Sequence, residues 1–156
     1  MIPILYTANE TDFSHCGIGA LSEMTSCAVT EERNGAFECE FKYPVDGKLF
    51  AEIQESCIVK AKPNEMSDPQ LFRIYASSKP INGIVTYRAE HISYELSGYP
   101  VESISVENAT ARAAMNAILN ATLIAHRYTA QSDIELLKST TIDRKSARAA
   151  LGGVEG

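Results

Sequence analysis

The sequence predicts an α+β fold that is mainly antiparallel β, with short peripheral helices and an α-rich segment near its C-terminal end. One observation is Asn82-Gly83 between two strand-like runs, a strong hairpin signal because a two-residue type I′ turn needs positive φ at both positions. A second glycine-tipped strand pair spans residues 23–43. From Val106 the strand-like alternation gives way to alanine-rich spacing of three and four residues, which favours helix.

The two-residue turn predicts the register of the main hairpin, with Ile81 opposite Ile84. Counting outward gives an apolar face with the pairs Pro80–Val85, Ser78–Tyr87, Ala76–Ala89 and Ile74–His91. The polar face then has the pairs Lys79–Thr86, Ser77–Arg88 and Tyr75–Glu90. Pro80 lacks an N–H, so we expect no further strand to pair beside it.

The second hairpin turns at Arg33-Asn34-Gly35. A two-residue loop would mix apolar and charged residues on both faces, whereas a three-residue loop separates them and places Gly35 in the left-handed position of a bulged turn. The three-residue loop sets Cys27 opposite Phe41 and Val29 opposite Cys39 on the inner face, and leaves outside Ala28, Thr30, Glu38 and Glu40.

The remaining elements follow from local signals. Strands are predicted at residues 2–6 and 56–62, with a polar loop over 7–19. Asp46 is predicted to cap a short helix with Leu49, Phe50 and Ile53 on one side. Further helical segments are predicted at residues 93–96, 108–121 and 143–151, the last with Asp143 as N-cap and Gly152-Gly153 as its stop. Residues 122–133 are compatible with either helix or strand.

The change in pattern predicts a β-rich domain over 1–105 and a partial second α+β domain over 106–156. Little apolar sequence follows the last predicted helix, so we expect the chain to be a fragment of a longer protein. The start MIPILY has neither the basic segment nor the apolar core of a signal peptide, and no run approaches the roughly 20 apolar residues of a membrane span. These features predict a soluble protein made in the cytoplasm.

The composition excludes some functions. A net charge of −6 argues against tight nucleic-acid binding, which depends on Lys and Arg neutralising phosphates, but it allows DNA to pass an acidic wall without being gripped. The cysteines are sparse, and we expect them to be reduced small side chains rather than a disulfide framework: Cys16, Cys27, Cys39 and Cys57.

Each reactive residue has a structural interpretation that is stronger than a catalytic one. His15-Cys16 lacks a second metal-ligand pair, and Cys57, His91 and His126 form no local signature of a cysteine hydrolase. Glu90 and His91 are predicted to point to opposite faces of one strand, so they cannot act on one atom. A solvated face or a partner surface explains the carboxylates better than glycoside chemistry: Glu31, Glu32, Glu38 and Glu40. The sequence therefore predicts no catalytic residues, no cofactor-binding residues and no metal ligands, and it predicts no bound cofactor.

A long collinear set of segments resembles a known family. The most specific are YPVDGKLF (43–50), DPQLFRIY (68–75) followed by PINGIVTYRAEHISYEL (80–96), and ALGGVEG (150–156). Together with the rest of the chain they resemble the N-terminal region of phage minor structural proteins. These are the tail hub or tail-associated lysin proteins of siphophages and prophages of Gram-positive bacteria.

The resemblance implies a β-barrel-like tail-hub domain in a structural protein of the virion tail tip, assembled in the host cytoplasm. It implies a homotrimeric ring around a channel through which DNA passes, bound to the distal tail protein and to tail tube or tape-measure components. Any peptidase would belong to a C-terminal module outside this chain. Two alternatives are a peptidoglycan-degrading endopeptidase and a carbohydrate or receptor-binding module, the latter suggested by Tyr75, Tyr87, Tyr94 and Tyr99.

Overall fold

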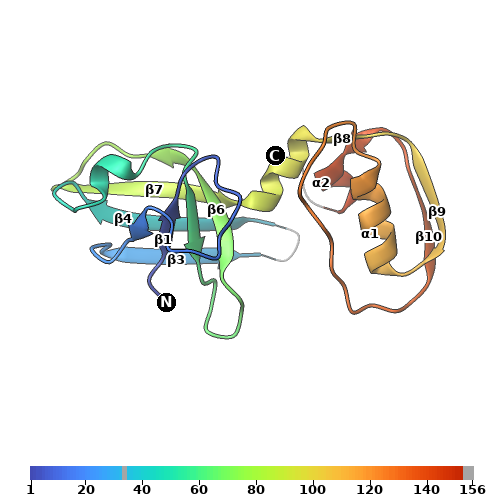
Figure 1. Cartoon of the computed structure of the whole chain (residues 1–156), viewed down its shortest axis with the longest axis horizontal. Coiled ribbons are helices and arrows are strands. Elements are labelled where there is room, and N and C mark those ends of the chain that lie inside the picture. The colour runs from blue at the N-terminus through green and yellow to red at the C-terminus, as the bar shows by residue number, and fades with distance from the viewer. Residues whose placement is uncertain (33–34, 153–156) are drawn as a thin grey trace. The chain divides into compact units, whose positions relative to one another are not determined.

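The structure is a computed structural model that describes residues 1–32 and 35–152 (Figure 1). The chain forms two compact units, Met1–Ile92 and Ser93–Gly156. The first unit is built mainly from antiparallel strands, and the second combines short antiparallel strands with helices, which confirms the predicted α+β class.

The first unit is one seven-stranded antiparallel sheet that curls into a half-barrel (Figure 1). A 3₁₀ helix, η1 (Phe50–Glu52), follows the fourth strand. The strands in sheet order are β2 (Gly19–Ala20), β1 (Ile4–Tyr6), β5 (Ile58–Ala61), β6 (Gln70–Ser77), β7 (Ile84–His91), β4 (Phe37–Pro44) and β3 (Ser26–Glu31).

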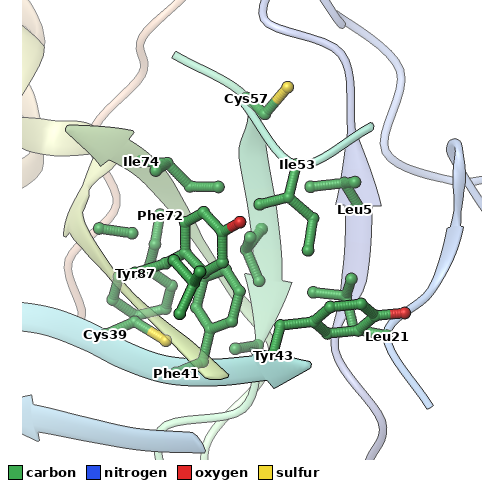
Figure 2. Close-up of a cluster of buried hydrophobic side chains, with 14 residues drawn as sticks. Leu5, Leu21, Cys39, Phe41, Tyr43, Ile53, Cys57, Phe72, Ile74 and Tyr87 are labelled. Carbon is green, nitrogen blue, oxygen red and sulfur yellow. The ribbon is translucent and has the colours of Figure 1, made fainter. Parts of the chain in front are cut away.

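The inner side of the curled sheet carries the core (Figure 2). Phe41 is fully buried and its ring stacks on Tyr87 with centroids 5.1 Å apart. Each buried side chain of this size contributes roughly 1.5–3 kcal/mol through removal from water. Loop residues complete the cluster beside the strands: Leu21, Ile53 and Cys57.

The tip of the main hairpin has the predicted geometry. Asn82 and Gly83 have φ values of 51° and 76°, and Ile81 pairs with Ile84. The predicted inward direction of Ile74, Val85, Tyr87 and Ala89 is also confirmed, since all are buried.

The register beyond the tip was predicted wrongly. Ser77 lies opposite Tyr87, Ala76 opposite Arg88, and Ile74 opposite Ala89, with a bulge at Tyr75. A second irregularity lies at Ser78, whose N–H donates to Thr86 O at 2.8 Å while its Oγ accepts from Thr86 N at 3.0 Å.

These irregularities add residues on the β6 side and increase the local twist, which suits a sheet that curls. The structure replaces six of the predicted pairs: Lys79–Thr86, Ser78–Tyr87, Ser77–Arg88, Ala76–Ala89, Tyr75–Glu90 and Ile74–His91.

The β3–β4 pair has the predicted register. Cys27 lies opposite Phe41 and Val29 opposite Cys39. Glu32 N donates to Ala36 O at 2.7 Å, as a three-residue loop requires. Arg33 and Asn34 lie outside the described residues. The predicted left-handed conformation of Gly35 belongs to the same turn and therefore stays a prediction.

The segment after β4 corrects one capping prediction. The predicted helix is the 3₁₀ helix η1, and its N-cap is Leu49 without a side-chain hydrogen bond, so Asp46 is not the cap. Leu49, Phe50 and Ile53 do pack on the core together, as their spacing predicted.

The second unit contains two small antiparallel sheets and two α-helices (Figure 1). Its core consists of Leu96, Val101, Ile118, Leu119 and Ala147. In chain order its elements are η2 (Ile92–Gly98), β8 (Pro100–Val101), β9 (Ile104–Ala109), α1 (Ala111–Asn120), β10 (Lys138–Ile142), β11 (Lys145–Ser146) and α2 (Ala147–Ala150).

Pairing across the second unit shifts the division of the chain. β8 pairs with β11 and β9 pairs with β10, so residues 93–105 belong with the C-terminal segment rather than with the β-rich domain expected over 1–105. Strand partners that are distant in the sequence decide this division, and a change in local pattern does not reveal them.

Helix caps in the second unit differ partly from expectation. α1 begins after Thr110, whose Oγ1 accepts from Ala113 N at 3.3 Å. The last helix is shorter than predicted and its N-cap is Ser146, because Asp143 instead accepts a hydrogen bond from the Ser103 hydroxyl. Gly152, with φ of 90°, follows this helix, and Gly153 lies outside the described residues.

Candidate functional site

The loop after β1 uses His15 for structure. Its Nδ1 accepts from Gly17 N at 2.9 Å, its Nε2 lies 3.4 Å from a Glu10 carboxylate oxygen, and Tyr6 Oη donates to its carbonyl at 2.6 Å. Cys16 is exposed in this loop. Across residues 1–32 and 35–152, no group of three or more His, Cys, Asp and Glu side chains is arranged to hold a metal ion.

The three groups considered for a cysteine hydrolase have separate surroundings. Cys57 is buried and its thiol points to Glu52 O at 3.7 Å. His91 stacks on Phe37 with centroids 4.3 Å apart. His126 belongs to the second unit, so the two histidines are placed by different cores.

His126 fixes the irregular segment after α1. Its Nε2 donates to Leu119 O at 2.8 Å and its Nδ1 accepts from Tyr128 N at 3.1 Å, which is the pattern of one neutral tautomer. Burial, followed by the hydrogen bond to the Glu95 carboxylate, raises the pKa of Tyr128. These polar groups hold residues 122–133, which form neither of the two elements considered for them.

Two carboxylates of the second hairpin, Glu38 and Glu40, lie along the outer side of the sheet. Glu38 is directly opposite Glu90, and Glu40 lies 3.4 Å from Arg88 Nε. Glu90 also faces Arg73 on β6, whereas His91 packs among aromatic rings of the core side, as predicted. The arrangement is a solvated, charged strand face.

The tyrosines differ in their surroundings. Tyr87 is 4% exposed and belongs to the core, as predicted, whereas Tyr75 at the bulge is 45% exposed. Tyr94 lies in the second unit, where the Arg148 guanidinium stacks 3.2 Å from its ring centroid, and Tyr99 packs against His126. The bulge therefore leaves Tyr75 on the outer face of the sheet.

A shallow hollow of about 400 Å³ lies on that outer face, over β4, β6 and β7. Charged and small polar side chains line it, which suits a wet contact surface better than a pocket for an apolar ligand. Its lining residues are Glu40, Lys42, Ala76, Ser77, Ser78, Ile81, Thr86 and Arg88.

Strand β3 forms one edge of the seven-stranded sheet. Its six residues, Ser26–Glu31, pair with β4 on one side, and five of the six are exposed. The strand carries no Pro and no Lys, the residues that commonly protect such edges from pairing with another chain. This edge is therefore open to association.

The second unit has a larger hollow of about 830 Å³ beside β8, β11 and α2. Arg144, Lys145 and Glu102 lie on its wall together with Leu123, which is 63% exposed. Other large apolar side chains are exposed along the same chain segment: Ile124, Ile134, Leu136 and Leu137.

A pair of cysteines is the contact that sequence reasoning missed. Cys27 Sγ lies 3.7 Å from Cys39 Sγ, across the diagonal of the β3–β4 ladder. A hydrogen bond from Cys39 lowers the pKa of the Cys27 thiol, and the same bond together with burial raises the pKa of Cys39. Cys27 is exposed, against the expectation of a covered inner residue, because β3 is the edge strand of the sheet that the described residues form. The predicted register already placed both thiols on one face, which was the available signal.

Comparisons with known proteins bear on the fold. The crystal structure of the prophage tail protein gp18 from Listeria monocytogenes EGD-e is similar to this chain with a TM-score of 0.60 and 15% sequence identity. The likeness covers 92% of this chain and 40% of that one, so the present chain spans less than half the length of its structural neighbour. No family model matches the sequence, and no curated protein matches it. The chain thus has the fold of part of a prophage tail protein.

Proposed function

We propose that this chain is a structural component of a phage or prophage tail tip, a baseplate hub that assembles as a ring and connects the tail tube to host-facing modules. The observation that carries the proposal is the fold likeness to a prophage tail protein over 92% of the chain. The segments that resemble phage minor structural proteins lie in both units, and they support it independently.

The open edge of β3 supports assembly. An edge strand presents unpaired N–H and C=O groups that a neighbouring subunit can satisfy, and a ring forms when this surface of one copy meets a different surface of the next copy. The polar hollow over β4, β6 and β7 offers a second contact face with both signs of charge. A homotrimer that joins the distal tail protein and tube or tape-measure components accounts for such surfaces.

The charge of the chain suits a conduit. At −6 the subunit repels phosphates overall, so DNA can pass through a ring of such subunits without being held. The charged outer side of the sheet, with its carboxylates on β4, is the surface expected to face water or the channel.

Solution mass tests the proposal. Light scattering over a concentration series is expected to show a species three times the 17.0 kDa chain mass, and electron microscopy with the distal tail protein of the same genome is expected to show rings. Ala28→Lys places a charge on the β3 edge and should weaken this association. The same substitution at the exposed Ala51, away from the edge, is the matched control.

Two results would contradict the proposed assembly. A chain that stays monomeric at every concentration and neither binds nor co-sediments with the distal tail protein would overturn the hub role. Equal weakening by Ala28→Lys and Ala51→Lys would remove β3 from the interface.

A further inference from the structure

We propose that Cys27 and Cys39 form a site of oxidative modification, in which a small disulfide such as oxidised glutathione converts the two thiols into an intramolecular disulfide. The assignment goes beyond the tail role and does not depend on it. It rests on two thiols of unequal exposure at 3.7 Å on adjacent strands.

The first thiol is accessible. Cys27 lies on the edge strand and is exposed, and it also lines a shallow hollow of about 240 Å³ beside the N-terminal residues. The Cys39 hydrogen bond that lowers its pKa favours the thiolate, the form that attacks a disulfide. A small disulfide can therefore react at Cys27 without opening the core.

The second thiol is placed to complete the reaction. Cys39 is 1% exposed, so bulky reagents do not reach it directly, yet its Sγ is in contact with Cys27 Sγ. The exposed Cys16 lies in the loop before β2, and Cys57 is buried with its thiol toward Glu52 O. Among the residues described, Cys27 is the thiol that contacts Cys39.

The chemistry balances in two steps. The Cys27 thiolate attacks one sulfur of oxidised glutathione, forms a mixed disulfide and expels one glutathione thiolate. Cys39 then loses its proton and attacks Cys27 Sγ, the bond to glutathione breaks, and a second glutathione leaves. Two protein thiols are oxidised, one disulfide is reduced, and the two protons end on two glutathione molecules.

Formation of the Cys27–Cys39 disulfide requires a movement that an edge strand can make. The S–S distance must shorten from 3.7 Å to about 2.05 Å, and diagonal neighbours of a ladder are slightly farther apart than most bridged residues. β3 pairs with β4 on one side only, so it can shift toward Cys39 without breaking a second ladder.

The experiment is thiol counting and peptide mapping after treatment with oxidised glutathione. The chain has four cysteines, and two titratable thiols should disappear, with a product lighter by two hydrogen atoms and restored by dithiothreitol. Trypsin leaves Cys16 and Cys27 in one peptide that ends at Arg33, so the map is made on Cys16→Ser, which should cross-link as the native chain does.

Variants separate the two steps. Cys39→Ala should stop at a mixed disulfide and gain one glutathionyl group at Cys27, whereas Cys27→Ser, at an exposed position, should lose no pair of thiols. A native chain that accumulates glutathione on Cys27 while Cys39 stays reduced would overturn the proposal, as would a cross-link found only between two chains.

Discussion

The ring of Tyr43 lies against Gly47, where an added Cβ would come within 2.4 Å of Tyr43 Cε1. Gly47 N donates to Pro44 O at 3.1 Å, so the turn after β4 holds this backbone directly over the buried ring. Close approach to an aromatic side chain, rather than a special backbone angle, is what makes a glycine necessary in the segment YPVDGKLF.

Gly47→Ala is expected to destabilise the chain by about 1–3 kcal/mol, because a methyl group there forces the Tyr43 ring or the turn to move. Urea unfolding measures the effect. Gly98→Ala is the control, since nothing lies within 4 Å of its added Cβ, and it should change the stability by no more than about 0.5 kcal/mol. Equal effects of the two substitutions would contradict the packing argument.

Glu23 should make stability depend on pH in the acid range. Hydrogen bonds from Lys48 N at 2.6 Å and from the Tyr43 hydroxyl at 3.0 Å lower the pKa of its carboxyl below the ordinary value of 4.5. A group with a lowered folded-state pKa stabilises the protein above its unfolded pKa and loses that contribution as pH falls through the folded value.

Glu23→Gln is therefore expected to reduce the loss of stability that accompanies a fall in pH below about 4.5. Thermal unfolding measured at several acid pH values checks this expectation. The exposed Glu55→Gln serves as a control and should leave the acid limb as steep as in the native chain. An unchanged acid limb in Glu23→Gln would show that other carboxylates carry the dependence.

Gly83→Ala should destabilise the main hairpin through backbone conformation alone. The added Cβ would meet only Val45 Cγ2 at 4.0 Å, but φ is 76°, which costs a side-chain-bearing residue about 1–2 kcal/mol. Asn82→Gly keeps both positive φ values accessible and should be tolerated within about 0.5 kcal/mol in the same unfolding assay. A harmless Gly83→Ala would mean that the turn can change type.

Thr110→Ala is expected to weaken the start of α1 by about 1 kcal/mol, because Ala113 N loses its side-chain acceptor. Hydrogen exchange of the first amides of α1 should accelerate. Thr110→Asp, which keeps an acceptor, should retain protection, and Thr129→Ala, at an exposed position outside the helix, should have no effect. Protection that survives in Thr110→Ala would assign the helix start to packing alone.

Local chemistry made part of this fold predictable. The Asn82-Gly83 turn, the three-residue loop register that pairs Cys27 with Phe41, and the helix around Ile118 all follow from neighbours in sequence. The bulge at Tyr75 was not predictable, because an inserted residue is selected by the twist of the whole sheet.

Helix caps also show that neighbouring residues alone do not predict the structure fully. Asp143 carries a good N-cap side chain, yet it bonds to the Ser103 hydroxyl, and Ser146 caps α2 instead. A capping preference is a fraction of the energy of strand pairing, so the β8–β11 and β9–β10 pairs set where the last helix begins.

The order of turns, the alternation of apolar residues and the net charge were determined by the sequence itself, because each depends on residues within a few positions or on a simple sum. The tertiary structure decided which strand lies at an edge, and therefore that Cys27 is exposed beside a buried Cys39. It also assigned residues 93–105 to the second unit, since pairing between distant segments outweighs local pattern.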